Sequence, residues 1–195
     1  MHKQLIMISL LLSSIQPFCY SLEIREALET DNVQIAHVHY KSWHDTYKDI
    51  HSATLIAQHT PQWFLEYWHK KFHDMAIASK NFVLVVVDQN KIVGFLMAGT
   101  IHNYQWLLQE HDCEIHKFYL LPETQKQGIG TQLFLACMQK LRTMGFSKML
   151  IRTLKENIKS CQFCRKHGGV CIKEQTCEVD DIVHEAFYSF DLNVT

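Results

Sequence analysis

The chain has 195 residues, about the length of one domain. Hydrophobic residues make up 47% of it and charged residues 20%, which excludes a disordered tail and a low-complexity scaffold. Its 19 lysines and arginines are offset by 20 aspartates and glutamates, so a nucleic-acid partner bound to a broad basic face is not expected.

The first 21 residues differ from the rest of the chain. His2 and Lys3 form a short basic start, Leu5 to Ile15 are mostly apolar, and Pro17 ends the run. This is the layout of a secretory signal peptide, which is too short for a membrane anchor. An extra N-terminal segment without that role explains it equally well. We expect the folded domain to cover residues 22–195 and not to insert stably in a membrane.

The N-terminal half predicts a strand, two helices and a hairpin, in that order. Leu22, Ile24 and Ala27 form a short alternating strand. Asp31 or Asn32 caps the first helix, and Pro61 begins the second. The first helix has a predicted apolar face of Val33, Ala36, His37 or Tyr40, and Trp43, and the second carries Trp63, Phe64, Tyr67, Trp68 and Phe72. The β-branched runs Phe82–Val87 and Ile92–Ala98 form a hairpin across Gln89-Asn90.

The C-terminal half alternates strands with helices. Cys113–Leu121 is a strand ended by Pro122, and Ile129–Met144 is an amphipathic helix that stops at Gly145. The remaining predicted elements are a strand over Met149–Thr153, a helix over Asn157–His167, and strands over Val170–Glu174 and Val183–Leu192. This order predicts an α/β domain on a mixed sheet.

The segment with the clearest chemical signal is Gln125-Lys126-Gln127-Gly128-Ile129-Gly130-Thr131, between a strand and the long helix. Glycines there permit strained torsions and let a ligand approach the backbone. Amides at a helix N-terminus are unpaired and lie at the positive end of its dipole, which suits a pyrophosphate. The dinucleotide pattern G-x-G-x-x-G is excluded because Leu133 stands in place of its third glycine, and a P-loop is excluded because Ile129 follows Gly128.

Several segments together resemble the GNAT superfamily of N-acetyltransferases. They are the strand Glu114 to Pro122, the loop Gln125-x-x-Gly128-x-Gly130 that matches the signature [QR]-x-x-G-x-[GA], and Asn157 with Phe163 and Gly168-Gly169. The likeness runs from about Leu22 to Leu192. It implies an α/β fold of the GNAT type, a mixed and mostly antiparallel sheet of about six or seven strands flanked by four helices. Residues 22–195 would form the N-acetyltransferase domain.

The resemblance also implies acetyl-CoA as the acyl donor. The strand end at Leu120 and Leu121 would pair with the pantetheine arm, and Asn157 would bind the pantetheine chain as well as cap its helix. The amides from Gln127 to Thr131 would hold the pyrophosphate. The full set of expected cofactor-binding residues is Leu120, Leu121, Gln125, Lys126, Gln127, Gly128, Ile129, Gly130, Thr131 and Asn157.

Acetyl transfer to an amine needs a base, a polarised thioester carbonyl and a proton for the departing thiolate. Glu114 is the expected base, with His116 on the same side of the strand as an alternative. A backbone amide near Leu120 can polarise the carbonyl. Relatives usually carry a tyrosine after the phenylalanine, where this chain has Cys164. We expect Cys164 to donate the proton; Tyr188, Tyr119 and solvent are the alternatives.

The predicted function is therefore transfer of an acetyl group from acetyl-CoA to a primary amine of an unidentified acceptor, by direct attack in a ternary complex. The change to Cys164 supports one alternative, a catalytically weak or inactive CoA-binding sensor or interaction module. Three acidic residues near the expected cleft favour a cationic acceptor: Glu110, Asp112 and Glu114. Edge-strand pairing, frequent among proteins of this kind, leaves a homodimer open.

The seven cysteines bear on metal binding and on compartment. Cys161 and Cys164 fall on a predicted helix and Cys171 and Cys177 along a strand, which is not the arrangement of a zinc site, so no metal is expected. An odd, scattered set of cysteines suits a reducing compartment. Because acetyl-CoA is a cytosolic metabolite, we expect the cytoplasm, with export through residues 1–21 as the alternative.

Overall fold

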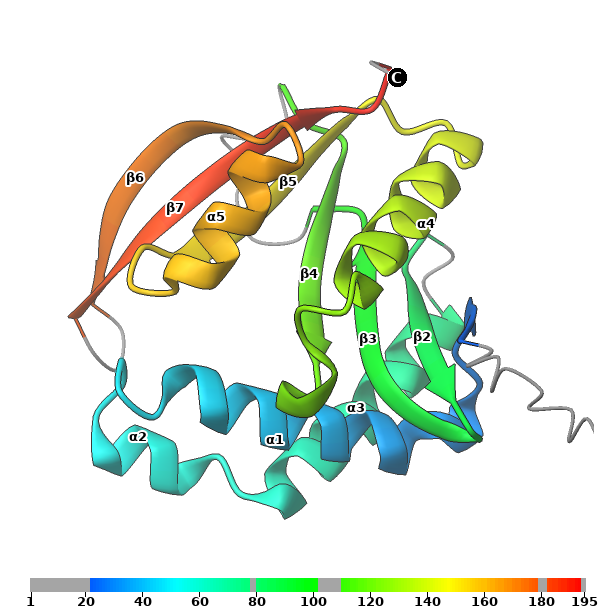
Figure 1. The fold of residues 1–195 in the computed structure, drawn as a ribbon, viewed down its shortest axis with the longest axis vertical. Helices are drawn as coiled ribbons and strands as arrows, with labels where there is room; N and C mark the ends of the chain where they lie inside the picture. The colour runs from blue at the N-terminus through cyan, green and yellow to red at the C-terminus, as the bar shows by residue number, and fades with distance from the viewer. Residues whose placement is uncertain (1–21, 78–79, 102–109, 179–181, 194–195) are drawn as a thin grey trace, which may run out of the picture.

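A computed structural model describes residues 22–77, 80–101, 110–178 and 182–193 (Figure 1). The prediction for residues 1–21 lies outside these ranges. The described strands are β1 (Glu23–Glu26), β2 (Phe82–Asp88), β3 (Lys91–Gly99), β4 (Cys113–Leu120), β5 (Lys148–Leu154), β6 (Val170–Glu178) and β7 (Ile182–Asp191). The described α-helices are α1 (Asn32–Tyr47), α2 (Ala53–Gln58), α3 (Pro61–Ile77), α4 (Ile129–Thr143) and α5 (Ile158–Lys166).

The strands form one sheet in the order β1-β2-β3-β4-β5-β7-β6. Every neighbouring pair is antiparallel except β4 and β5, which are parallel. The β2–β3 turn explains part of this order, because Gln89 and Asn90 have φ of 47° and 64°. Two successive left-handed residues are typical of a tight hairpin turn whose twist matches that of the strands. The predicted hairpin and the predicted mixed, mostly antiparallel sheet are confirmed.

Each face of the sheet has its own hydrophobic core. On one face, α4 and α5 pack residues such as Leu133, Phe134 and Cys161 against β2 to β5 and β7. On the other, α1 and α3 pack Ile35, Val38 and Trp68 against β2 and β3. Figure 1 shows α4 and α5 in front of the sheet, with α1, α2 and α3 below.

The predicted buried face of the first helix was partly wrong. Ala36 is buried and Tyr40 and Trp43 pack against the core as predicted, but Val33 is 60% exposed, and Ile35 and Val38, which the prediction left out, are fully buried. The polar His39 and Ser42 also lie on the buried face, so this face does not stand out as an apolar stripe in the sequence. Trp68 Nε1 donates to His39 Nδ1 at 3.2 Å, and Ser42 donates to the Leu120 carbonyl at 2.8 Å. Hydrogen bonds of this kind let polar groups be buried.

Two further expectations need correction. Four flanking helices were expected, but the described residues contain five, because the short α2 was missed; Ser52 caps it by accepting from the Leu55 amide at 3.3 Å. Asp31 occupies the N-cap position of α1 without bonding to its amides. Its carboxylate instead accepts from Arg25 at 2.7 Å and from the Leu28 amide at 2.8 Å. No helix among the described residues is long and apolar enough to cross a membrane.

Candidate active site

The parallel strands β4 and β5 separate in the middle of the sheet. They pair only at Cys113, Glu114 and Ile115, and from residue 116 onward β4 has no strand beside it on that side within the described residues. Figure 1 shows the two strands diverging. A break in a sheet exposes strand amides and carbonyls that would otherwise be paired, so this opening is a natural place for a bound chain with polar groups.

A β-bulge in β4 accompanies the separation. Met97 pairs with Lys117 and the next residue, Ala98, pairs with Ile115, which leaves His116 as the extra residue of β4. A bulge shifts the alternation of side chains by one position. Consequently Ile115 and Phe118 belong to the α4/α5 core, while Lys117 and Tyr119 lie toward α3 and α1. Strict alternation along the strand would have put Lys117 on the opposite face from Glu114.

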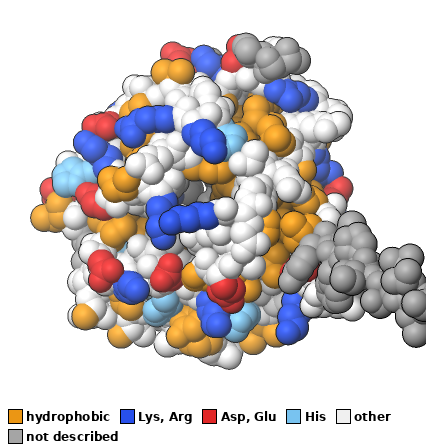
Figure 2. All heavy atoms as spheres, in the orientation of Figure 1, with side chains coloured by type: hydrophobic (Ala, Val, Ile, Leu, Met, Phe, Trp, Pro, Cys, Tyr) orange, Lys and Arg blue, Asp and Glu red, His pale blue; other side chains and the backbone are white. Residues whose placement is uncertain are grey.

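The opening contains a cavity of about 230 Å³, which we call the central passage. Its walls come from α1, β4, β5, α5 and the loop before α4. They include residues from both faces of the sheet: Ser42, Tyr47, Ile115, His116, Lys117, Phe118, Tyr119, Leu120, Gln125, Gly130, Arg152, Asn157, Phe163 and Cys164. The central passage therefore leads through the sheet. Figure 2 shows this face of the molecule hollowed near its middle, with Lys or Arg side chains beside the hollow.

Free amides gather at one end of the central passage. Gly128 has φ of 81° at the N-cap of α4, and Lys126 has φ of 62°. Among the described residues, no backbone hydrogen bond uses the amides of 126–131, the last three of which open α4. A glycine is required at 128 by its torsion, since nothing lies within 4 Å of the place a Cβ would take. The geometry is that of an anion site at a helix N-terminus.

The edge of β4 supplies further backbone groups. The Leu121 amide donates to the Val93 carbonyl of β3 at 2.9 Å. Because bonding alternates along an antiparallel pair, the amides of Phe118 and Leu120 point away from β3, into the opening. The Leu120 carbonyl already accepts from Ser42 at 2.8 Å and from Gln125 Nε2 at 3.2 Å. The Leu120 amide therefore points into the opening and is not used by β3.

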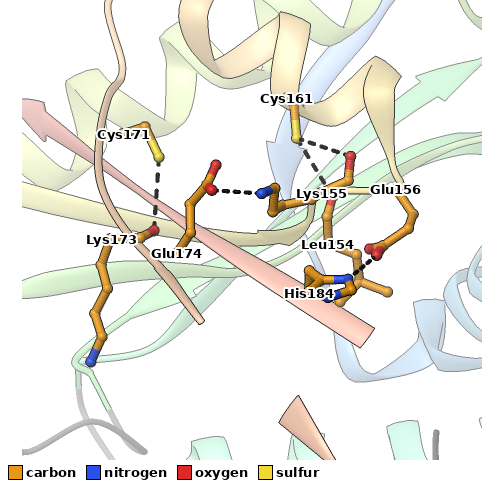
Figure 3. Close-up of polar contacts among 8 residues, drawn as sticks. All are labelled: Leu154, Lys155, Glu156, Cys161, Cys171, Lys173, Glu174 and His184. Carbon is orange, nitrogen blue, oxygen red and sulfur yellow. Dashed lines mark hydrogen bonds and ion pairs between the residues drawn. The ribbon is translucent and has the colours of Figure 1, made fainter. Parts of the chain in front are cut away.

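Asn157 is held firmly at the start of α5. Its Oδ1 accepts from the Ser160 amide at 3.1 Å, which confirms the predicted cap, and its side chain lies near Tyr47 and acts to lower the pKa of that hydroxyl. The turn before Asn157 is held by several contacts (Figure 3). In one of them, Cys161 Sγ donates to the Leu154 carbonyl at 3.5 Å. Two ion pairs add to this, Lys155 to Glu174 at 2.6 Å and His184 to Glu156 at 2.7 Å.

Proton donors line the central passage near α5. Cys164 is 1% exposed, and burial first, with Cys161 nearby, raises its thiol pKa to about 12. Tyr47 and Tyr119 lie close enough to perturb each other's ionisation, and burial raises the pKa of both hydroxyls. All three groups keep their protons at neutral pH. Tyr188, in contrast, does not line the central passage. The sequence did not identify Tyr47 as a candidate proton donor, because it lies on α1, far along the chain from Cys164 on α5.

A second cavity of about 310 Å³, the side cavity, continues from the central passage on the α3 side of the sheet. The two share His116, Lys117 and Arg152. Glu114 lies in the side cavity only, with its carboxylate 3.7 Å from His116 Nδ1. The other lining residues are Tyr67, Lys71, Asp74, Met75, Asn81 and Met97.

Charges in the side cavity perturb one another. Burial raises the pKa of Glu114, against the opposing pull of Arg152 and Lys117. Burial also lowers the pKa of Lys117 to about 8, with help from the like charges of Arg152 and Lys71. Raised carboxylate and lowered ammonium pKa values at one place are typical of a functional site. Lys117 and Arg152 were not predicted from the sequence.

The predicted residues divide into three groups. Leu120, Gln125, Gly130, Asn157 and Cys164 line the central passage, and Glu114 lines the side cavity. The loop residues Lys126, Gln127, Gly128 and Thr131 do not line it but present their amides beside it, while Ile129 is buried in the α4/α5 core and Leu121 packs against both cores. Asp112 lines neither cavity; it accepts hydrogen bonds from Ser147 and Lys148. Among the described residues, no three His, Cys, Asp or Glu side chains are grouped to hold a metal ion.

Comparison with known proteins adds independent evidence. The acetyltransferase (GNAT) family model matches residues 37–169, which is more than half of the chain. An uncharacterized N-acetyltransferase of Bacillus subtilis (strain 168), YuaI, is 28% identical over 134 residues, covering 69% of this chain and 72% of the relative.

Solved structures share the fold. The PaiA N-acetyltransferase of Thermoplasma acidophilum, in complex with coenzyme A, is 22% identical with a TM-score of 0.64, covering 85% of this chain and 98% of that one. An N-acetyltransferase of Staphylococcus aureus Mu50 is 18% identical with a TM-score of 0.69, covering 88% and 99%. The structure of yncA from Salmonella typhimurium, with its cofactor acetyl-CoA, is 15% identical with a TM-score of 0.65, covering 89% and 95%.

Proposed function

Because this chain belongs to the acetyltransferase (GNAT) family, we propose that it moves an acetyl group from acetyl-CoA to a primary amine by direct attack in a ternary complex. The observation that carries the proposal is the central passage, which connects the free amides of 126–131 to the side cavity with Glu114. A donor and an acceptor that enter from opposite sides of the sheet can meet there. The relatives solved with coenzyme A and with acetyl-CoA support the choice of donor.

The donor is held mainly by backbone. Amides of Gln127 to Thr131 bind the pyrophosphate at the α4 N-terminus. Leu120, Leu121 and Asn157 border the path of the pantetheine arm, and Gln125 and Lys126 complete the loop. The lack of a side chain at Gly130 leaves room in the central passage, since a Cβ there would lie 3.2 Å from Leu120 Cδ1.

The transfer then uses groups from both cavities, Leu120 and Cys164 from the central passage and Glu114 from the side cavity. The neutral amine nitrogen attacks the thioester carbon while the Leu120 amide stabilises the oxyanion. The new carbon–nitrogen bond forms, the carbon–sulfur bond breaks, and Glu114 takes the proton that the amine loses. Cys164 gives a proton to the departing thiolate. Solvent then restores Cys164 and removes the proton from Glu114.

A calorimetric titration of the full chain with acetyl-CoA tests the donor site. Gly128→Val and Gly145→Val are a matched pair, since both glycines have φ near 80° and nothing lies within 4 Å of either Cβ position. The two variants therefore lose similar stability from backbone strain. We expect only Gly128→Val to weaken acetyl-CoA binding, by about tenfold or more. Absence of binding to the unaltered chain near millimolar acetyl-CoA would refute the proposal.

The same proposal extends to the domain boundary and compartment. We propose that residues 22–195 form the acetyltransferase domain and that it acts in the cytoplasm, where acetyl-CoA is made available. N-terminal sequencing of the protein purified from its natural source tests this. A mature chain that starts near residue 22 would favour export through residues 1–21 instead. The alternative of a catalytically inactive sensor predicts acetyl-CoA binding without transfer to any amine.

A further inference from the structure

The side cavity is lined by more cationic than anionic groups. Lys71, Lys117 and Arg152 face two carboxylates, Asp74 and Glu114. The acidic residues in the sequence predicted a cationic acceptor, but Glu110 lines neither cavity, and Asp112 is committed to the start of β5. The cations of the side cavity therefore bear on the acceptor more directly than Glu110 and Asp112 do.

Two of the cations lie around one aromatic ring. Lys71 Nζ is 5.7 Å from the centre of the Tyr67 ring and Lys117 Nζ is 5.9 Å from it. Lys71 and Tyr67 come from α3, whereas Lys117 comes from β4, where the bulge turns it to this face. Two positively charged ammonium groups therefore lie near the same ring and repel each other.

Arg152 is already paired with a carboxylate, that of Glu185 in β7, so Lys71 and Lys117 are the two cations of the side cavity that remain to bind an anion. Glu114 lies beside His116. Repulsion from Lys71 and Arg152 contributes to the lowered pKa of Lys117, whereas Glu114 opposes it less strongly. A bound anion would relieve this repulsion, since opposite charges favour the protonated lysine.

We propose that the acceptor is an amine that also carries a carboxylate, held by Lys71 and Lys117 in the side cavity while its amino group faces Glu114. Because Arg152 is paired with Glu185, Lys71 and Lys117 are the two cations that remain, and the two oxygens of one carboxylate can accept from both ammonium groups. A phosphate, close to two negative charges at neutral pH, is the alternative anion that the test includes. The inference rests on the proposed function and adds the class of acceptor.

Matched acceptors test the inference with the full chain and saturating acetyl-CoA. Glycine, β-alanine and γ-aminobutyrate are each compared with the corresponding primary amide, with phosphoethanolamine as the phosphate arm and agmatine as the cationic amine. The measurement is release of the CoA thiol. We expect at least one amino carboxylate to exceed its amide about tenfold or more in kcat/KM, the range of a charge-assisted hydrogen bond.

Two lysine variants on α3 separate recognition from general charge. Lys71→Met should reduce the preference for the carboxylate about tenfold, chiefly through KM, because it removes one of the two ammonium groups. Lys70→Met removes the neighbouring charge, which is exposed and lines neither cavity, and should leave the preference unchanged. Lys71→Glu should shift the preference toward agmatine.

The outcomes distinguish this inference from the proposed function. If acetyl-CoA binds but no amino carboxylate is acetylated faster than its amide, the carboxylate inference is overturned and the donor site stands. Equal loss in Lys71→Met and Lys70→Met would also overturn it. A preference for phosphoethanolamine would replace the carboxylate by a phosphate. Failure to bind acetyl-CoA at all would remove the proposed function itself.

Discussion

The two ends of the site use different parts of the chain. At the loop before α4, recognition depends on backbone amides, on the φ of 81° at Gly128 and on the absence of a side chain at Gly130. In the side cavity it depends on charged side chains from α3, β4 and β5. A backbone site tolerates many side chains but few conformations, whereas a side-chain site requires particular residues. The two ends should therefore respond to different kinds of substitution.

The largest effect on donor affinity is expected where an added side chain occupies the backbone end. In Gly130→Val, a Cβ 3.2 Å from Leu120 Cδ1 and further methyl groups narrow the central passage. We expect acetyl-CoA affinity to fall by about 100-fold, roughly 2.7 kcal/mol, with the acceptor cavity intact. Calorimetry measures the affinity, and thermal unfolding checks that the fold is kept. Unchanged affinity in a folded variant would mean that the donor takes another path.

Substitutions in the side cavity should change the catalytic rate rather than the affinity for acetyl-CoA. Glu114→Gln keeps the shape of the side chain but removes the base, so kcat should fall by about 100-fold or more. The raised pKa of Glu114 predicts that the unaltered enzyme loses activity as pH falls through that pKa, because the base becomes protonated. Steady-state kinetics across pH should show this limb and its absence in the variant. Acetyl-CoA affinity should stay within about twofold.

Cys164 and Cys161 provide a matched pair on α5. Both thiols are buried, but only Cys164 lines the central passage. If Cys164 protonates the thiolate, Cys164→Ala should reduce kcat about tenfold while Cys161→Ala leaves it nearly unchanged. Single-turnover kinetics with acetyl-CoA measures the step directly. A large loss in Tyr47→Phe with none in Cys164→Ala would assign the proton to the tyrosine.

The smallest effect on catalysis is expected at Asp112, an acidic residue that supports structure. Burial raises the pKa of its carboxyl, but hydrogen bonds from Lys148 and Ser147 outweigh this and leave the pKa lowered. Asp112→Asn should cost about 1 kcal/mol of unfolding free energy at neutral pH. Because a lowered folded-state pKa gives stability that is present above the unfolded-state pKa and is lost as pH falls through the folded-state pKa, the difference should shrink in acid, below the ordinary pKa of an aspartate. Urea unfolding measures it, and acetyl transfer should change less than twofold.

Local sequence patterns predicted most of the fold and the loop of free amides before α4. Alternation of apolar residues predicted the strands, and Gln89-Asn90 predicted the hairpin, because these are local properties of the chain. The spacing of Gln125, Gly128 and Gly130 predicted the amide loop for the same reason. A position that needs a left-handed torsion is usually a glycine, so the sequence shows it. The buried face of α1 was predicted only in part, since His39 and Ser42 are buried through partners far along the chain, Trp68 and the Leu120 carbonyl.

The residues of the side cavity, in contrast, could not be grouped without the tertiary structure. Lys71, Lys117 and Arg152 are separated widely in sequence and meet because α3 packs beside β4 where β4 leaves β5. The bulge at His116 turns Lys117 to the same face as Glu114, and strand alternation gives no warning of it. The charge of the side cavity, and with it the kind of acceptor, depends on contacts between distant segments that local sequence patterns do not encode.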